Sequence, residues 1–266
     1  MEFSTKVTIP SPKTKITPQD RLLFVGSCFA DNIGKRFIDN GFNAVVNPFG
    51  VMYNPVSVLH TISRLSEEER QNVDVTVITL GTNHVYRERS TGQIVDNCQK
   101  RPANLFQEEI LDIKACRDAL AEAVAMLSGR VIITVSPIRY RKYGYHESQL
   151  SKATLLLAAD MLAKENPAKV FYFPAYELVN DELRDYRFYK ADMLHPSDQA
   201  VEYIFERFAE TYFSDETNKF LDEWRPLKEA LGHRPLNPDS AEYKLFLEKT
   251  KNKVEALKMR YPHVNV

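Results

Sequence analysis

Hydrophobic residues along this chain occur in two alternating patterns. Five short continuous runs, rich in β-branched and aromatic residues, predict strands buried on both faces, at 22–25, 43–47, 74–80, 130–135 and 169–173. The segments with apolar residues at every third or fourth position predict helices, at 29–38, 55–65, 107–127, 148–166 and 198–212. Strands that alternate with helices in this way indicate a parallel sheet with helices on both faces.

The apolar stripes predict which face of each helix is buried. The first helix carries Phe29, Ile33 and Phe37 on one stripe, and the helix that Ser197 caps carries Val201, Ile204, Phe205, Phe208 and Tyr212. For the helix at 148–166 we predict that the inward residues are Leu150, Thr154, Leu157, Met161 and Leu162.

Two further segments depart from this alternation. The turn Ser90-Thr91-Gly92 between β-prone pieces predicts a hairpin within 85–97. Beyond Ser214 the chain is rich in charge and proline and ends in an amphipathic helix after Ser240. We therefore expect one α/β domain over 1–213 and a helical C-terminal extension over 214–266, which packs on the same domain or on a partner.

Right-handed crossovers restrict such a chain to a doubly wound, flavodoxin-like sheet of five parallel strands in a three-layer α/β/α sandwich. Ligands of these sheets bind beyond the carboxyl ends of the strands. Polar or small residues follow the predicted strands or lie on a late loop: Ser27, Gly50, Asn83, Ser136 and His195. The sequence therefore predicts a site at this edge.

Composition limits the partners of the protein. The 266 residues carry a net charge of -1, with 27% charged residues, so neither a nucleic acid nor a membrane surface is favoured. Three cysteines without a CxxC pair provide no disulfide framework, and the N-terminus lacks the pattern of a signal peptide. We expect a cytoplasmic protein without a cofactor.

The segment Gly26-Ser27-Cys28 lies between the first predicted strand and the first predicted helix. A strand, a tight turn and a helix together expose a side chain near the positively charged N-terminus of the helix. This arrangement suits a nucleophile, although such turns are more often purely structural.

The chain resembles the GSCFA-motif family within the SGNH hydrolases. The motif stands at Gly26 to Ala30, and Asn47-Pro-Phe-Gly50, Leu80-Gly-Thr82, Asn97-Cys98 and Asp192-Met-Leu-His195 follow in the expected order. The resemblance covers about residues 20 to 213. It implies an α/β/α sandwich with an esterase-like site, without defining a substrate.

The resemblance implies roles for these residues. His195 is the expected base, and Asp192, three residues earlier, is expected to orient its imidazole. The expected oxyanion donors are the backbone N–H after Gly26, the N–H of Gly50 and an asparagine amide, for which Asn83 and Asn97 compete.

The nucleophile is left open between two neighbours. The hydrolase block reads G-D-S, so alignment by residue type selects Ser27, whereas alignment of the glycines without a gap selects Cys28. A thiol near a helix N-terminus is readily activated, but a small buried cysteine is also common.

His84 and Arg139 are expected to contact the substrate, and the spacing of histidines and cysteines matches no metal site. We expect hydrolysis of short acyl esters, such as an acetylated carbohydrate. The alternatives are an acyltransferase with the same Ser/Cys-His-Asp site and a non-catalytic binding module. A homodimer is compatible with the amphipathic tail.

Overall fold

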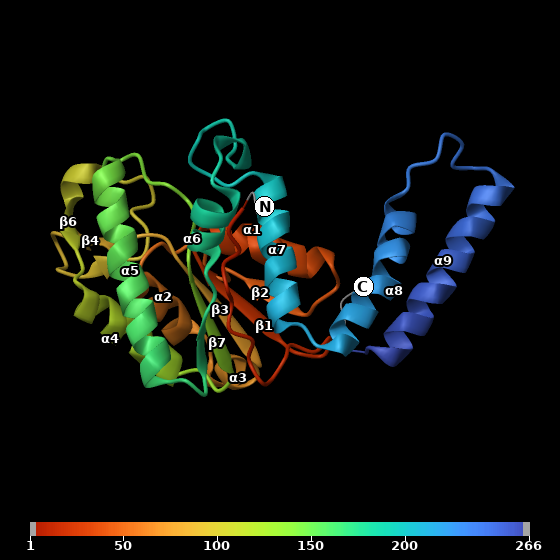
Figure 1. The fold of residues 1–266 in the computed structure, drawn as a ribbon, viewed down its shortest axis with the longest axis horizontal. Helices are drawn as coiled ribbons and strands as arrows, with labels where there is room; N and C mark the ends of the chain where they lie inside the picture. Colours follow the sequence, from red (N-terminus) through yellow and green to blue (C-terminus); the bar gives the residue numbers. More distant parts are fainter. Residues whose placement is uncertain (1–3, 263–266) are drawn as a thin grey trace.

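A five-stranded parallel sheet forms the centre of the molecule, in a computed structural model that describes residues 4–262 (Figure 1). Its strand order is β2-β1-β3-β7-β8, the order of flavodoxin-like sheets. The strands are β1 (Leu22–Gly26), β2 (Ala44–Val46), β3 (Val75–Leu80), β7 (Arg130–Val135) and β8 (Val170–Tyr172). The predicted fold class and the five predicted strands are confirmed.

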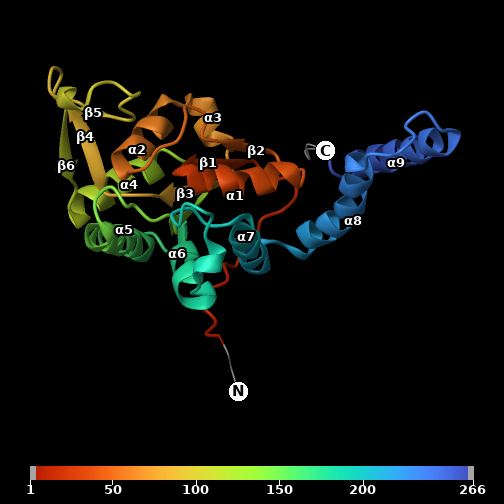
Figure 2. The same cartoon turned by 90° about the horizontal axis from the view of Figure 1, so that it is seen from above.

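Helices cover both faces of this sheet, as the view from above shows (Figure 2). One face packs against α1 (Cys28–Asp39) and α7 (Asp198–Tyr212). The other packs against α2 (Pro55–Arg64), α4 (Ile113–Ala125) and α5 (Tyr145–Glu165), with the short α3 (Glu67–Gln71) after α2. The connection after β8 contains α6 (Ala175–Glu177), η2 (Leu178–Leu183) and η3 (Tyr186–Phe188).

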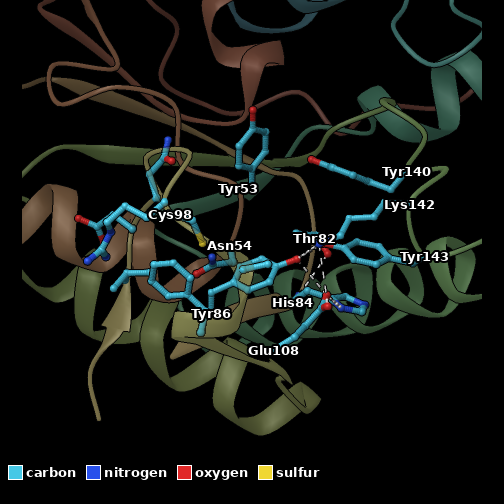
Figure 3. Close-up of a pocket in the computed structure, with 16 residues that line it drawn as sticks. Tyr53, Asn54, Thr82, His84, Tyr86, Cys98, Glu108, Tyr140, Lys142 and Tyr143 are labelled. Atoms are coloured by element: carbon cyan, nitrogen blue, oxygen red, sulfur yellow. Dashed lines mark hydrogen bonds and ion pairs between the residues drawn. The ribbon is translucent and has the colours of Figure 1, made fainter. Parts of the chain in front are cut away.

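A second, antiparallel sheet of three strands extends beyond the carboxyl end of β3. It has the order β5-β4-β6 and consists of β4 (His84–Glu88), β5 (Ile94–Val95) and β6 (Phe106–Ile110), the last preceded by the turn η1 (Ala103–Leu105). The predicted hairpin is confirmed. This sheet forms one wall of a pocket (Figure 3).

The predicted helix at 107–127 is wrong over its first residues. Ile110 pairs with His84 in the antiparallel sheet, and α4 begins at Ile113 with Asp112 as its N-cap. The apolar spacing over 107–127 spans a strand and a helix, because Phe106–Ile110 finds hydrogen-bonding partners on β4 that the local pattern does not reveal.

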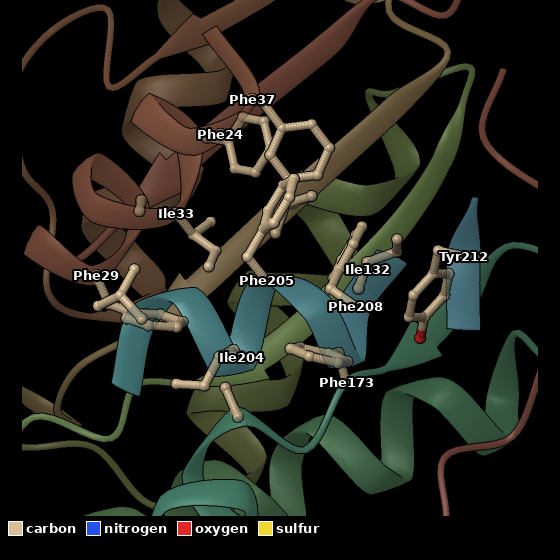
Figure 4. Close-up of a cluster of buried hydrophobic side chains, with 14 of the residues drawn as sticks. Phe24, Phe29, Ile33, Phe37, Ile132, Phe173, Ile204, Phe205, Phe208 and Tyr212 are labelled. Atoms are coloured by element: carbon tan, nitrogen blue, oxygen red, sulfur yellow. The ribbon is translucent and has the colours of Figure 1, made fainter. Parts of the chain in front are cut away.

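Aromatic rings dominate the core between the sheet and its α1/α7 layer (Figure 4). The Phe37 ring of α1 lies 4.8 Å from Phe24 of β1 and 5.5 Å from Phe208 of α7, centroid to centroid. Phe29, Ile33 and the predicted stripe of α7 are buried as well, so the predicted inner faces of both helices are confirmed.

The predicted inner face of α5 is wrong except at Leu162, which is buried as predicted. Leu150 and Leu157 are about half exposed, whereas the buried residues are Ser148, Ser151, Lys152, Leu155, Ala158, Ala159 and Leu162. This face carries several small residues, which let the helix axis approach its neighbours closely. Lys152 lies on the same face and is therefore buried as well.

Two helices follow the domain: α8 (Asp215–Gly232) and α9 (Ala241–Arg260), which project together to one side (Figure 1). The sequence predicted the second helix but not the first. They share a small apolar cluster that includes Phe220, Trp224 and Leu257. Phe220 also packs against Phe42 of the domain, with ring centroids 6.1 Å apart. Among the described residues, no helix is both long and apolar enough to cross a membrane.

Candidate active site

The turn between β1 and α1 is fixed by contacts with neighbouring strands. Gly26 has φ +139°, and a Cβ on it would lie 2.1 Å from the Thr79 carbonyl oxygen. The Gly26 N–H donates to Asn47 Oδ1 at 2.9 Å, and the Ser27 N–H donates to the Thr79 oxygen at 3.0 Å. The backbone here can therefore carry only glycine, and the next two residues are held at the carboxyl edge of the sheet.

Ser27 has a structural position in this turn. Its side chain is 0% exposed. Its Oγ accepts a hydrogen bond from the Phe29 N–H at 3.2 Å, which makes Ser27 the N-cap of α1, and lies 3.0 Å from Thr79 Oγ1. Both interactions hold the hydroxyl beneath the helix start.

Cys28 is the first residue of α1 and is only partly buried. Its thiol lies at the positive end of the helix dipole. Burial raises its pKa and the Asp31 carboxylate adds to this, while the nearby Lys152 charge lowers the pKa. Of the two candidate nucleophiles, Cys28 is the one that the structure leaves accessible.

The Asp192 and His195 side chains form a hydrogen-bonded pair. His195 Nδ1 lies 2.6 Å from Asp192 Oδ2, and Asp192 Oδ1 accepts from the N–H groups of Leu194 and His195. These backbone hydrogen bonds, together with the imidazole, hold the pKa of Asp192 well below its usual range. The predicted pair is thus formed, with the Nδ1 edge of the ring fixed.

The other edge of the His195 ring has no protein partner within residues 4–262. The ring is hydrogen-bonded to Asp192, and no hydrogen bond joins the ring to Ser27 or Cys28. The loop that carries it is held by Arg139, whose N–H donates to Leu194 O and whose Nη1 donates to Met193 O, each at 3.0 Å. The catalytic role of His195 therefore stays a prediction.

Gly50, Asn83 and Asn97, three of the predicted oxyanion residues, occupy different surroundings. The Gly50 N–H donates to Asn47 O within a turn, and Asn83 is buried with Nδ2 donating to Leu111 O at 2.7 Å. Asn97 lines the large pocket, and its Oδ1 accepts from the Gln99 N–H. Gly50 and Asn83 thus use these donors within the protein, and all three oxyanion roles stay predictions.

The large pocket has a volume of about 700 Å³ and lies between the strand ends and the three-stranded sheet (Figure 3). Aromatic and polar side chains alternate along its walls. His84 stacks on Tyr143 with ring centroids 3.8 Å apart and bonds Glu108 through Nδ1 at 2.9 Å. Tyr53 and Tyr140 also line this pocket. Burial raises the pKa of both phenols, and the charge of the Cys28 thiol adds to this effect.

Tyr140 carries a hydroxyl that is buried and without a hydrogen-bond partner among the described residues. A Cβ on Gly81 would lie 2.4 Å from this hydroxyl, so the missing side chain there makes room for it. Sequence reasoning did not select Tyr140. The Arg139 side chain, predicted to contact substrate together with His84, lines a separate pocket of about 280 Å³ that includes Gln149 and Tyr189.

Sequence reasoning also missed Lys152, because the predicted stripe of α5 placed it outside. Lys152 is 2% exposed, and its Nζ donates to Gly81 O and to Ser136 O, both at 2.7 Å. These carbonyls follow β3 and β7, so the amine lies under the edge that carries Cys28. Burial lowers the pKa of Lys152 to about 7, against the opposing effect of the thiol.

No group of three or more His, Cys, Asp or Glu side chains within residues 4–262 is arranged to hold a metal ion. The sheet has the flavodoxin-like strand order, and the turn with Cys28 and the Asp192–His195 pair lie on loops of this α/β domain. The chain belongs to the GSCFA family: the family model matches residues 21–72 and 67–208, and a model of the GSCFA C-terminal domain matches residues 224–266.

Solved structures are similar to this chain at low sequence identity. A catalytic mutant of Axe2, an acetylxylan esterase from Geobacillus stearothermophilus, is 13% identical with a TM-score of 0.50, over 76% of this chain and 98% of that one. A lipolytic protein of the G-D-S-L family from Veillonella parvula is 15% identical with a TM-score of 0.46, over 72% and 97% of the two chains. A search of curated proteins found no match.

Proposed function

We propose that this protein hydrolyses short acyl esters, and that Cys28 is its nucleophile. The observation that carries the proposal is the accessible thiol at the N-terminus of α1, at the same sheet edge as the loop with the Asp192–His195 pair. A nucleophile, a base oriented by a carboxylate and nearby hydrogen-bond donors are the parts that acyl transfer requires.

In the proposed reaction the sulfur of Cys28 attacks the ester carbonyl carbon and forms a thioester as the C–O bond to the alcohol breaks. The proton of the thiol leaves with the alcohol. In the second half His195 takes a proton from water, the resulting hydroxide attacks the thioester, and the C–S bond breaks. The proton then returns to the sulfur, so the products are the acid and the free enzyme.

The developing oxyanion needs donors near Cys28. The Tyr140 hydroxyl is buried, unpartnered among the described residues, and close enough to sense the charge of the thiol. We include it with Asn97, which lines the same pocket. Gly50 and Asn83 serve only if their present hydrogen bonds to Asn47 and Leu111 open.

The large pocket supports the proposed substrate class. Its walls combine rings that can stack on sugar faces, Tyr53, Tyr86 and Tyr143, with polar groups such as Asn97 and Glu108 that can bond hydroxyls. The fold is shared with an acetylxylan esterase, which favours an acetylated carbohydrate. The sugar would occupy the pocket while its acetyl group lies at Cys28.

Acetate release from acetylated xylo-oligosaccharides and from 4-nitrophenyl acetate tests this proposal. We expect both esters to be hydrolysed by the intact chain and neither by Cys28→Ala. Equal rates for the two proteins would overturn it. Addition of a sugar alcohol as acceptor separates hydrolysis from transfer, because a transferase forms a new ester and releases less free acetate.

A further inference from the structure

Lys152 is a buried lysine that the proposed reaction does not yet use. Its amine is sealed from solvent beneath the carboxyl edge of the sheet, and none of the described carboxylates forms an ion pair with it. A buried amine without a counter-charge costs free energy when it is protonated. The burial of this amine without a counter-charge therefore calls for an explanation.

The hydrogen bonds of Nζ match a neutral amine. It has two acceptors, Gly81 O and Ser136 O, each at 2.7 Å. A neutral amine donates two hydrogens and keeps one lone pair, whereas an ammonium group has a third N–H to satisfy. With both hydrogens occupied, the lone pair is free to accept a proton.

The position of Nζ relates it to Cys28. Gly81 follows β3, two residues after Thr79, and Thr79 holds Ser27, the neighbour of Cys28, through both its carbonyl and its hydroxyl. Lys152 and the turn of Cys28 are therefore both bonded to the carboxyl end of β3, and the charge of each group shifts the pKa of the other.

Arg139 and Tyr145 line the same small cavity as Lys152. The rings of Tyr140 and Tyr176 face Nζ at 5.2 and 5.9 Å. Asp31 on α1 acts on the thiol, whose charge also reaches Tyr53. None of Tyr53, Tyr140 and Tyr176 titrates near neutrality, since burial raises the pKa of each phenol. Of the groups named here, Lys152 is the one whose pKa is shifted toward neutrality, to about 7, because it is buried.

We propose that the amine of Lys152 accepts the proton of Cys28 and so activates the sulfur as the nucleophile. The S–H bond breaks and an N–H bond forms, so the neutral pair becomes a thiolate and an ammonium. When the alcohol leaves the ester, it takes this proton and the neutral amine is restored. His195 then serves the second half of the reaction. This assignment rests on the proposed function for the identity of the ester and for Cys28 as the nucleophile.

Alkylation of Cys28 by iodoacetamide as a function of pH tests the assignment without any substrate. Mass spectrometry locates the label. Alkylation of Cys98, which lines the large pocket, serves as the internal control for the reactivity of the reagent at each pH. In the wild-type chain we expect the rate at Cys28 to rise around pH 7, where the buried amine loses its proton. In Lys152→Met we expect the rate near neutrality to fall about tenfold or more, with the rise moved toward alkaline pH.

Lys169→Met is the matched control. Lys169 also donates to two backbone carbonyls, those of Val124 and Leu127, but it precedes β8 and so lies at the opposite end of the sheet. We expect its alkylation profile to equal that of the wild type. An alkylation profile of Lys152→Met that equals that of the wild type would overturn the assignment. It would also be overturned if the rise near pH 7 were lost in His195→Ala but kept in Lys152→Met.

A second measurement does not depend on a folded Lys152 variant. In the wild-type chain labelled with 13C-lysine, we expect one lysine signal to titrate near pH 7, and its midpoint to fall in Cys28→Ala because the thiolate charge is removed. No lysine titrating below about pH 9 would contradict the assignment. If Lys152→Met alters the alkylation profile but the wild-type chain hydrolyses no ester, the proposed function is rejected and the role of Lys152 is kept. If the wild-type chain hydrolyses esters but Lys152→Met leaves the alkylation profile unchanged, the role of Lys152 is rejected and the proposed function is kept.

Discussion

The Oγ atom of Ser27 lies 3.0 Å from Thr79 Oγ1, in a side chain with no exposed surface. This contact joins the start of α1 to β3 and occupies the hydroxyl that motif alignment by residue type selects as nucleophile. The next side chain, Cys28, is the one that reaches the surface. The chemistry and the support of the turn are thus divided between two adjacent residues.

Exchange of each residue for alanine distinguishes these roles. We expect Cys28→Ala to abolish ester hydrolysis and the thioester intermediate detected by mass spectrometry. Ser27→Ala should retain both but lose about 1 to 2 kcal/mol of stability, because α1 loses its N-cap. Thermal unfolding measures the second effect. An inactive, fully folded Ser27→Ala with an active Cys28→Ala would reverse the assignment.

The Asp192–His195 pair leads to a second prediction. We expect His195→Ala and Asp192→Asn each to lower kcat/KM for acetyl esters by about a hundredfold or more, since the base is lost or misoriented. The matched control is Asp198→Asn, a nearby exposed carboxylate paired with Lys190, which should leave kcat/KM within about twofold. Equal losses in all three variants would indicate damage to the loop instead.

We expect the Tyr143 ring, which stacks on His84, to contribute to binding of the sugar part of the substrate. We expect Tyr143→Ala to raise KM for acetylated xylo-oligosaccharide about tenfold while kcat/KM for 4-nitrophenyl acetate changes little, because the stacking ring contacts only the larger substrate. Tyr186→Ala, which removes a ring from the separate pocket with Arg139, is the control. A matching change for both substrates would place Tyr143 at the ester itself.

His60 and Asp96 make the stability of the pocket dependent on pH. Nδ1 of His60 lies 2.7 Å from Asp96 Oδ1, and this hydrogen bond raises the pKa of His60. A raised folded-state pKa stabilises the fold fully below the unfolded value of about 6.5, and this contribution disappears as pH rises through the folded value.

We therefore expect the difference in Tm between wild type and His60→Gln to be largest in mildly acid solution and to shrink in alkaline solution. The effect is small, because the ring is partly exposed. Differential scanning fluorimetry across this range measures it. A difference that grows with pH would contradict the assigned direction.

Phe220 connects the C-terminal helices to the domain. Its ring is 0% exposed and lies 6.1 Å from Phe42 and 5.2 Å from Tyr261, centroid to centroid. We expect Phe220→Ala to lower the free energy of unfolding by about 3 to 5 kcal/mol. Leu231→Ala on the exposed side of the same helix should cost about 0.5 kcal/mol or less. Denaturant unfolding of both variants decides the comparison.

Local pattern was enough for most of the fold. The continuous apolar strands and the stripes on α1 and α7 predicted the parallel sheet and its aromatic layer, because each element must bury its own apolar face. Pattern failed where partners distant in sequence decide. Phe106–Ile110 becomes a strand because β4 offers hydrogen bonds, and the first tail helix, with Pro226 inside it, forms against α9.

The candidate site divides in the same way. The sequence by itself determined the turn at Gly26, which no other residue fits, and the Asp-x-x-His spacing, since a side chain three residues away reaches its partner locally. Only the tertiary structure decided that Ser27 is buried, that Arg139 and His84 line separate pockets, and that Lys152 is buried beneath the carboxyl edge of the sheet. These facts depend on how α5 and the strand ends meet, and packing between distant segments is not encoded in the spacing of either one.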